Sequence, residues 1–182
     1  MDEGKEKEKF IKSQIFYLTI MGGLSRGYIY RKGATEFRKN IFKKFLKKQL
    51  EYYGKIYKNG VEPDEHIENI KEFKKNIEEE FSDVLQNNKL RFGTSQKLLN
   101  LYLKYLWSLN WIKKPPHCPF DSIIISKLGK EFKKIFLTKF DDEESYKKLV
   151  EAARKISVNN IAGWELEYFN NYSEKQNISS YV

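Results

Sequence analysis

The stretch TSQKLLNLYLKYLWSLN, residues 94–110, decides the fold of this 182-residue chain. Its apolar side chains follow helical spacing but leave almost no polar face, unlike the one-sided pattern of a surface helix. They are Leu98, Leu99, Leu101, Tyr102, Leu103, Tyr105, Leu106, Trp107 and Leu109. A helix of this kind has to be covered on all sides, so we expect it at the centre of the fold.

The flanking segments predict further helices with one apolar face each. Before the central helix we expect one over residues 5–21 that ends at Gly22-Gly23, one over 35–53 between a Thr35 cap and Gly54, and one that begins at Pro63. After it we expect helices that begin at Asp121 or Ser122, at Asp141 and near residue 161. No long strand pattern is present. The predicted class is all-α, a compact bundle of about seven helices without a substantial sheet.

Two residues receive specific predictions within these helices. Phe37 belongs to the apolar stripe of the helix over 35–53, together with Phe42 and Leu46. His66 begins a helix that is dense in acidic residues, and we expect it at the surface.

Composition limits the domain organisation. A hydrophobic content of 40% with 15% aromatic residues is enough for a real core. We expect one helical domain over residues 1–172, with two lobes and a cleft near 90–125 as the alternative arrangement, and a flexible tail over 173–182. We expect a monomer.

The cysteine count and the hydropathy bear on location. A single cysteine excludes an internal disulfide and any site that needs several thiolates, which favours a cytoplasmic protein. The apolar run over residues 15–21 is too short to cross a bilayer, and its flanks do not resemble a secretion signal. We expect no membrane span, no metal and no cofactor.

Charge is arranged in blocks along the chain. The net charge is +9; residues 1–60 hold 15 basic and 6 acidic residues, 61–85 hold 3 and 9, 86–139 hold 11 and 2, and 140–182 hold 5 and 8. Two basic blocks that share one face would attract a polyanion, most simply a nucleic acid. A lysine bias on solvated helix faces is the plainer interpretation.

A short loop after the central helix concentrates unusual residues. Residues 115–125, PPHCPFDSIII, contain three of the four prolines, the only cysteine and one of the two histidines, just ahead of Asp121. Upstream, Gly93 precedes Lys97 in the first turn of the central helix. The order is therefore glycine, lysine, apolar helix, loop, and aspartate at the start of the next helix.

This order resembles the helix-hairpin-helix superfamily of DNA glycosylases. Lys97-Leu98-Leu99-Asn100 is similar to the start of that family's catalytic helix, and Pro119-Phe120-Asp121 is similar to its proline, apolar residue and catalytic aspartate. The resemblance covers residues 90–125. It implies an enzyme that flips a damaged or modified base out of double-stranded DNA and cleaves its N-glycosidic bond, with or without abasic-site lyase activity, in repair or in antiviral defence.

The resemblance implies Asp121 and Lys97 as catalytic residues, and the chemistry agrees. Cleavage builds positive charge on the deoxyribose, which a carboxylate near C1′ stabilises. A lysine that attacks C1′ has to be neutral, which a helix N-terminus and a partly dry pocket favour. The expected base-pocket residues are Gln96, Trp107, Trp111, His117 and Phe120. The expected DNA-binding residues are Lys89, Arg91, Gly93, Thr94, Ser95, Lys104, Lys113 and Lys114.

Two other classes of function fit the residues. In a helical nucleic-acid-binding module without enzymatic activity, Asp121 is only a helix cap and the tryptophans belong to the core. In a metal-dependent nuclease, Asp121, Glu131 and Lys133 supply the spaced carboxylates and the lysine. That pattern normally lies on β-strands, so the nuclease ranks below the other two classes.

Overall fold

A computed structural model describes residues 2–24, 29–132 and 140–179, with side chains to residue 174. These residues form seven α-helices and three short 3-10 helices, and their only strand-like pairing is a single bridge between Tyr30 and Leu85. The prediction of an all-α bundle is therefore confirmed. None of the helices in the described ranges is both long and apolar enough to span a bilayer.

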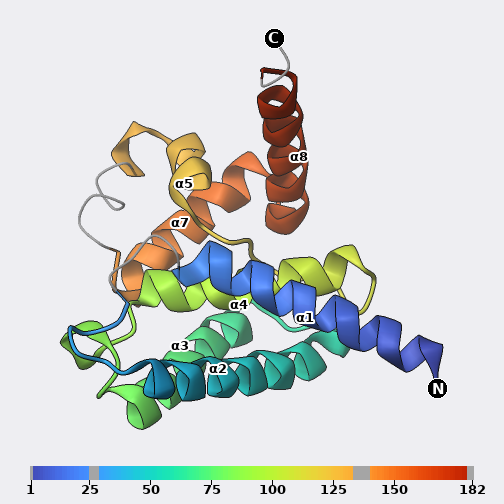
Figure 1. Cartoon of the computed structure of the whole chain (residues 1–182). Helices are drawn as coiled ribbons and strands as arrows, with labels where there is room; N and C mark the ends of the chain where they lie inside the picture. Colours follow the sequence, from blue (N-terminus) through green and yellow to red (C-terminus); the bar gives the residue numbers. More distant parts are fainter. Residues whose placement is uncertain (1, 25–28, 133–139, 180–182) are drawn as a thin grey trace.

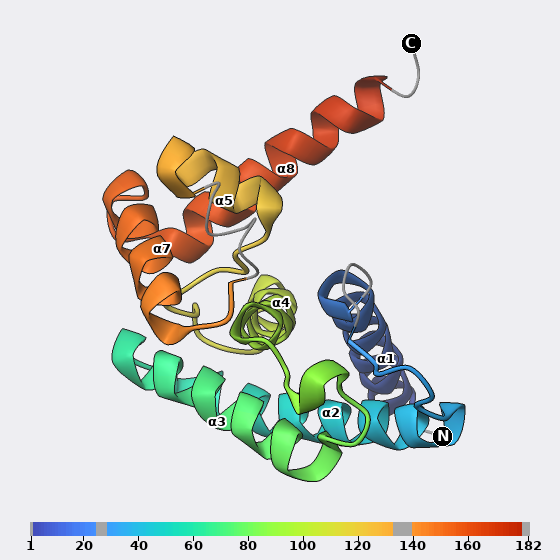
Figure 2. The ribbon, with the colours of Figure 1, turned by 90° about the vertical axis from the view of Figure 1, so that its left-hand side faces the viewer.

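The helix α4 (Phe92–Ser108) lies at the centre of the bundle, as its all-round apolar sequence predicts. Seen along its axis, it is surrounded by α1 (Glu3–Leu24), α2 (Glu36–Ile56) and α3 (Pro63–Phe81) below and beside it, with α5 (Ser122–Leu128) and α7 (Glu143–Ile156) above (Figure 2). Its side chains Leu98, Leu99 and Leu103 are completely buried.

Three glycines that the sequence suggests as helix stops lie inside helices instead. α1 continues through Gly22 and Gly23 to Leu24, and α2 continues through Gly54 to Ile56. A Cβ on Gly22 would come within 2.8 Å of Leu101, and one on Gly54 within 2.9 Å of Leu106. These glycines are therefore required by the close approach of α1 and α2 to α4, and not by a turn.

The helices α2 and α3 form the layer beneath α4 (Figure 1). Thr35 caps α2 by accepting a hydrogen bond from the Arg38 amide at 3.2 Å, and Pro63 occupies the first turn of α3. The prediction for Phe37 is wrong, because its side chain is 75% exposed. It precedes the stripe formed by Phe42 and Leu46, which are fully buried.

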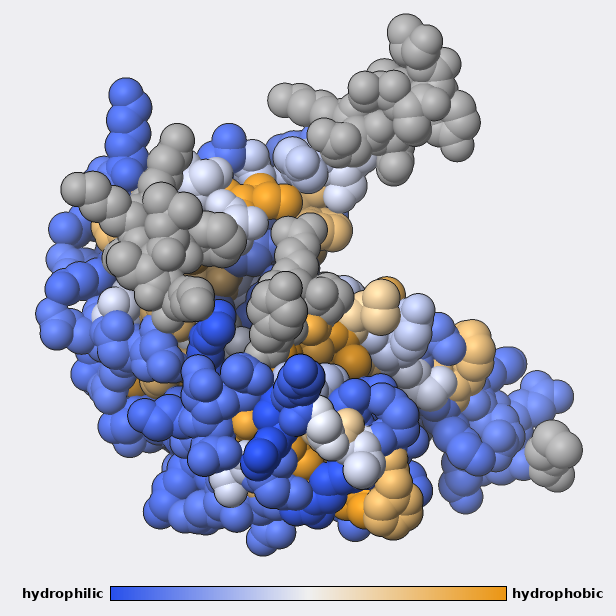
Figure 3. Space-filling view, turned by 60° about the vertical axis from the view of Figure 1, so that its left-hand side comes forward, coloured by the Kyte–Doolittle hydropathy of each residue, from blue (hydrophilic) through white to orange (hydrophobic). Residues whose placement is uncertain are grey.

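The C-terminal helices form the opposite side of the molecule (Figure 1). Asp142, rather than Asp141, caps α7 through the Ser145 amide at 2.6 Å. The last helix, α8 (Ile161–Ser179), runs seven residues past Tyr172, where we expected the helical part of the chain to end. In the space-filling view a deep hollow separates the side that carries α8 from the side that carries α1 (Figure 3).

Candidate active site

Asp121 occupies the position that the sequence predicts, at the N-terminus of α5. Its Oδ1 accepts hydrogen bonds from the amides of Ile123 at 2.9 Å and Ile124 at 3.0 Å. The second carboxylate oxygen, Oδ2, makes no hydrogen bond to the described part of the chain. One oxygen therefore fixes the side chain at the start of α5.

The side chain of Gln96 joins the start of α4 to the start of α5. Its Nε2 donates to the Phe120 carbonyl at 2.8 Å, and its Oε1 accepts from the Phe120 amide at 3.1 Å. Gln96 is completely buried, so it has no access to a base. Its neighbour Lys97 is half-buried. These two hydrogen bonds tie the Phe120 backbone, next to Asp121, to the side chain of Gln96, which precedes Lys97 on α4. Phe120 and Gln96 are 24 residues apart in the sequence.

Asp121 lines a cavity of about 260 Å³ between α5 and α8. Its walls come from two isoleucines of α5 and from an acidic, aromatic side of α8. The α8 residues are Glu165, Tyr168, Phe169, Tyr172 and Ser173. A small cavity that combines a carboxylate with flat apolar side chains suits a planar ligand with a polar or developing positive group.

A buried ion pair lies at the edge of this cavity. Lys104 Nζ is 2.8 Å from Glu165 Oε1 and 4.1 Å from the centre of the Phe169 ring. Lys104 was expected to contact phosphate; it is 8% exposed, and its ammonium pairs with Glu165. Burial raises the pKa of Glu165, the Lys104 ammonium opposes the rise, and the charge of Asp121 adds to it. The cavity therefore lies beside a second carboxylate whose charge is balanced by a lysine of the central helix.

Sequence reasoning missed Glu165 and the aromatic residues beside it. Its burial could have been predicted from the spacing of residues along α8. Glu165 is four residues after Ile161 and three before Tyr168, which places it on the buried side of the helix. An acidic residue in such a stripe is rarely buried without a partner.

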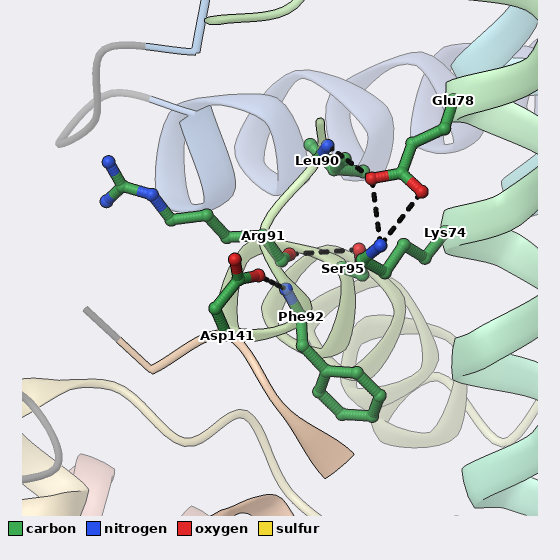
Figure 4. A network of polar contacts seen from close by, with 7 residues as sticks. All are labelled: Lys74, Glu78, Leu90, Arg91, Phe92, Ser95 and Asp141. Carbon is green, nitrogen blue, oxygen red and sulfur yellow. Dashed lines mark hydrogen bonds and ion pairs between the residues drawn. The ribbon is translucent and has the colours of Figure 1, made fainter. Parts of the chain in front are cut away.

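The N-terminus of α4 is held by hydrogen bonds to groups of the protein. Asp141 Oδ1 accepts from the Phe92 amide at 3.0 Å, and the Ser95 hydroxyl donates to the Arg91 carbonyl at 3.1 Å (Figure 4). A carboxylate from the protein thus occupies the place where a phosphate would bind a helix N-terminus. Ser95 is buried, and a Cβ on Gly93 would come within 2.8 Å of Phe140. Ser95 is therefore turned away from the surface, whereas Gly93 is half-buried.

A neighbouring bond holds the same segment from the other side. Glu78 accepts the Leu90 amide at 2.8 Å and pairs with Lys74 at 2.8 Å (Figure 4). The segment that leads into α4 is therefore fixed by two carboxylates, from Glu78 and Asp141. This fixed segment replaces the short glycine hairpin that the resemblance implies.

Both histidines lie in the interior. His66 is completely buried, so its predicted surface position is wrong, and its Nδ1 is 2.5 Å from the Tyr57 hydroxyl. His117 is buried against it, with ring centres 4.8 Å apart, and its Nδ1 is 3.0 Å from the Tyr146 hydroxyl. Burial lowers the pKa of His66 to about 3 and that of His117 well below its usual range.

The loop that precedes Asp121 is packed into the core. Cys118 and Phe120 are buried, as is His117, and burial raises the pKa of the Cys118 thiol. None of the three lines the Asp121 cavity, so the predicted base-pocket roles of His117 and Phe120 do not fit. The loop is a packed connector that places Asp121 at the N-terminus of α5.

The remaining predicted residues are spread over the surface. Lys89, Lys113 and Lys114 are exposed, and Arg91, Thr94, Trp107 and Trp111 are half-buried. Lys114 donates to the Asn160 side chain at 2.9 Å. Trp111 lines a separate groove with residues of α1 and α2, and not the Asp121 cavity.

The structure gives little support to the pattern of a metal-dependent nuclease. Lys133 lies outside the described residues, and Glu131 belongs to the 3-10 helix η3 (Lys130–Phe132) beyond the end of α5. Over residues 2–24, 29–132 and 140–179, no group of three or more His, Cys, Asp or Glu side chains has the arrangement of a metal site.

Comparisons with protein-family models, with curated proteins and with solved structures found no match to this chain.

Proposed function

We propose that the protein is a DNA N-glycosylase that accepts a flipped nucleotide in the cavity beside Asp121. The observation that carries the proposal is the position of Asp121: it is held by the α5 amides and lines a cavity with aromatic walls. The resemblance of residues 90–125 to helix-hairpin-helix glycosylases supports the same residue. The replacement of the glycine hairpin by carboxylate caps makes this a divergent example.

In this reaction the bond between C1′ and the base nitrogen breaks, and positive charge develops on the sugar. The Asp121 carboxylate, fixed through Oδ1, stabilises that charge through Oδ2 and orients the water that attacks C1′. Tyr168 and Phe169 line the cavity and give it aromatic walls beside which a flipped base would lie. A cavity of about 260 Å³ suits a single base better than a longer segment of nucleic acid.

Lys97 is the proposed amine for a lyase step. It lies on α4 seven residues before Lys104, hence two turns away on the same side of the helix. Lys104 forms an ion pair with Glu165, which lines the cavity. The Gln96 bonds to Phe120 tie the segment before Asp121 to the first turns of α4, where Lys97 lies, while Lys97 itself is outside the lining of the cavity.

The proposed partner is double-stranded DNA with one nucleotide flipped, bound by a monomer. The single buried thiol of Cys118 supports a cytoplasmic location, where a thiol stays reduced. Repair of a damaged base and removal of a modified base from foreign DNA use the same chemistry, and both belong to the proposal.

A substrate panel tests the proposal. The protein is incubated with DNA duplexes that carry oxidised, alkylated, deaminated or phage-type modified bases, and free base and abasic sites are measured. Borohydride trapping on the same DNA reports an amine nucleophile, and Lys97→Ala identifies it. We expect release from at least one duplex. Absence of release from every duplex, by a protein that is folded by circular dichroism, would falsify the proposal and leave a binding module as the better account.

A further inference from the structure

A second concave site lies along the C-terminal half of α4 and the segment that follows it. A groove of about 840 Å³ runs between the N-terminal half of α1, the C-terminal end of α2 and the segment that follows α4. Figure 1 shows these three segments meeting on the side of the molecule that carries the N-terminus. The groove is larger than the Asp121 cavity and shares no lining residue with it.

Lysines line both sides of this groove. Lys7 and Lys12 come from α1, and Lys55 and Lys58 from α2 and the 3-10 helix η1 (Tyr57–Asn59) that follows it. Lys55 and Lys58 form no ion pair within the described part of the chain. Two acidic residues also line the groove, so its lining carries four positive and two negative charges.

The acidic residues offset part of the positive charge, since Lys12 and also Lys58 lower the pKa of Glu8. Glu8 is held by Lys12 at 2.5 Å, and Glu51 lies 4.0 Å from Lys47, a lysine outside the groove. Lys113, from the second basic block of the sequence, packs on Gly60 beside the groove. The groove lysines, all from the first basic block, and Lys113 beside them give this side of the molecule an excess of positive charge that favours a polyanion.

The groove also has an aromatic and apolar floor. Trp111 is half-buried and is fixed by a hydrogen bond from its amide to the Leu106 carbonyl at 3.0 Å. Tyr102 and Ile11 line the groove beside it. Lysines on both sides of an aromatic floor match the way that single strands are bound, with phosphates at the lysines and a base stacked on the ring. The paired bases inside a duplex cannot reach such a floor.

We propose that this groove binds a single strand of nucleic acid, with phosphates on Lys55 and Lys58 and a base on Trp111. The site does not depend on the proposed reaction, because it contains neither Asp121 nor Lys97. DNA and RNA share the phosphate and base chemistry that the groove recognises, so strands of both kinds serve as probes.

Fluorescence anisotropy with labelled oligothymidylate and oligouridylate of about 16 nucleotides, the upper end of known site sizes, tests the proposal. The first variant is Lys55→Ala/Lys58→Ala. Its matched control, Lys43→Ala/Lys44→Ala, removes two charges from α2, where Lys44 lies about 16 Å from Lys55 along the helix axis. We expect the groove variant to reduce the slope of log K against log salt by about 1.4, at about 0.7 per phosphate, and the control to leave it unchanged.

The aromatic contact has its own variants. Trp111→Ala is expected to weaken strand binding by about 5- to 100-fold, while Trp111→Phe keeps a stacking surface and loses much less. Asp142→Asn, a change at the α7 cap outside both sites, is expected to bind the strand like the unaltered protein. Equal losses in the two lysine variants, no strand binding at low salt, or a loss confined to duplex binding would overturn the proposal.

Discussion

Two groups of polar side chains lie inside this helical protein, and they differ in charge and in access to solvent. The first surrounds His66 and His117, which contact the hydroxyls of Tyr57 and Tyr146. All of these side chains are buried, and burial disfavours the charged form of each histidine. The second contains Asp121, Glu165 and Lys104, which meet at the edge of a cavity.

The difference supports the proposal that the reaction takes place at the Asp121 cavity and that the histidine network is structural. Neutral polar groups can be buried at low cost when they bond to one another, and such a network fixes a unique packing of helices. Buried charges cost far more and are found mainly where they are paired or used. We therefore assign chemistry to the cavity of Asp121 and a structural role to the histidine network, although histidine is the commoner catalytic residue.

The largest expected effect comes from breaking the charged pair. Glu165→Gln leaves the Lys104 ammonium without a counter-charge in a buried position, which is expected to cost about 3–5 kcal/mol in the free energy of unfolding. Urea denaturation measures it. The double variant Lys104→Met/Glu165→Leu removes both charges and is expected to recover most of the loss. If the single and double variants are equally stable, the pair is not the desolvated contact described above.

A smaller effect is expected in the neutral network. Tyr146→Phe removes the hydroxyl shared by His117 and Asn100, at a cost of about 1–3 kcal/mol. Tyr53→Phe is the matched control, because the Tyr53 hydroxyl is buried without a partner in the described structure. Its removal is expected to be neutral or stabilising. Equal effects of the two variants in urea denaturation would contradict a bonded network.

Low pH is expected to destabilise the protein through the two histidines of the same network. Both histidines have a lowered pKa in the folded protein, about 3 for His66, whereas in the unfolded chain they take up protons near pH 6.5. The unfolded state therefore binds more protons, and stability falls as pH drops below about 6.5, by about 1.4 kcal/mol per pH unit for each histidine.

Unfolding in urea between about pH 7 and pH 5 measures this slope before ordinary carboxylates titrate. His66→Gln is expected to remove about half of it. A slope that is unchanged in this variant would show that His66 is not the buried neutral group described above.

The smallest effect concerns the helix caps. Asp142→Ala is expected to lose about 1 kcal/mol by removing the α7 cap, and Asp142→Asn only a few tenths, because asparagine caps almost as well. Thermal melting compares the two. The same reasoning predicts that Asp121→Asn retains the α5 cap. A large loss of stability in Asp142→Asn would make asparagine unsuitable as a test at Asp121.

The sequence predicts the helical elements well and their ends less well. The all-round apolar pattern of residues 94–110 located the central helix, and Asp121 and Pro63 located helix starts. The helix ends predicted at Gly22, Gly23 and Gly54 are wrong. A glycine that ends a helix cannot be told by sequence from one that allows a neighbouring helix to pack closely. Only the packing partner distinguishes them.

The site was predictable only at Asp121 and in its link to the start of α4. Gln96 was expected to read a base and instead bonds to the Phe120 backbone, since its side chain is turned inward by the packing of α4. Glu165 lies 61 residues from Lys104, so no local spacing could relate them. The inward register of His66 was visible from Ile70 and Phe73, four and seven residues later on α3.

The role of Asp121 is tested most directly by single-turnover release of base from the best duplex in the panel. We expect Asp121→Asn to slow release by about 100-fold or more, since it removes the charge that stabilises the transition state but keeps the cap. Asp142→Asn is expected to release base at the unaltered rate. Equal rates in all three proteins, with equal melting temperatures, would contradict the assignment of chemistry to the Asp121 cavity.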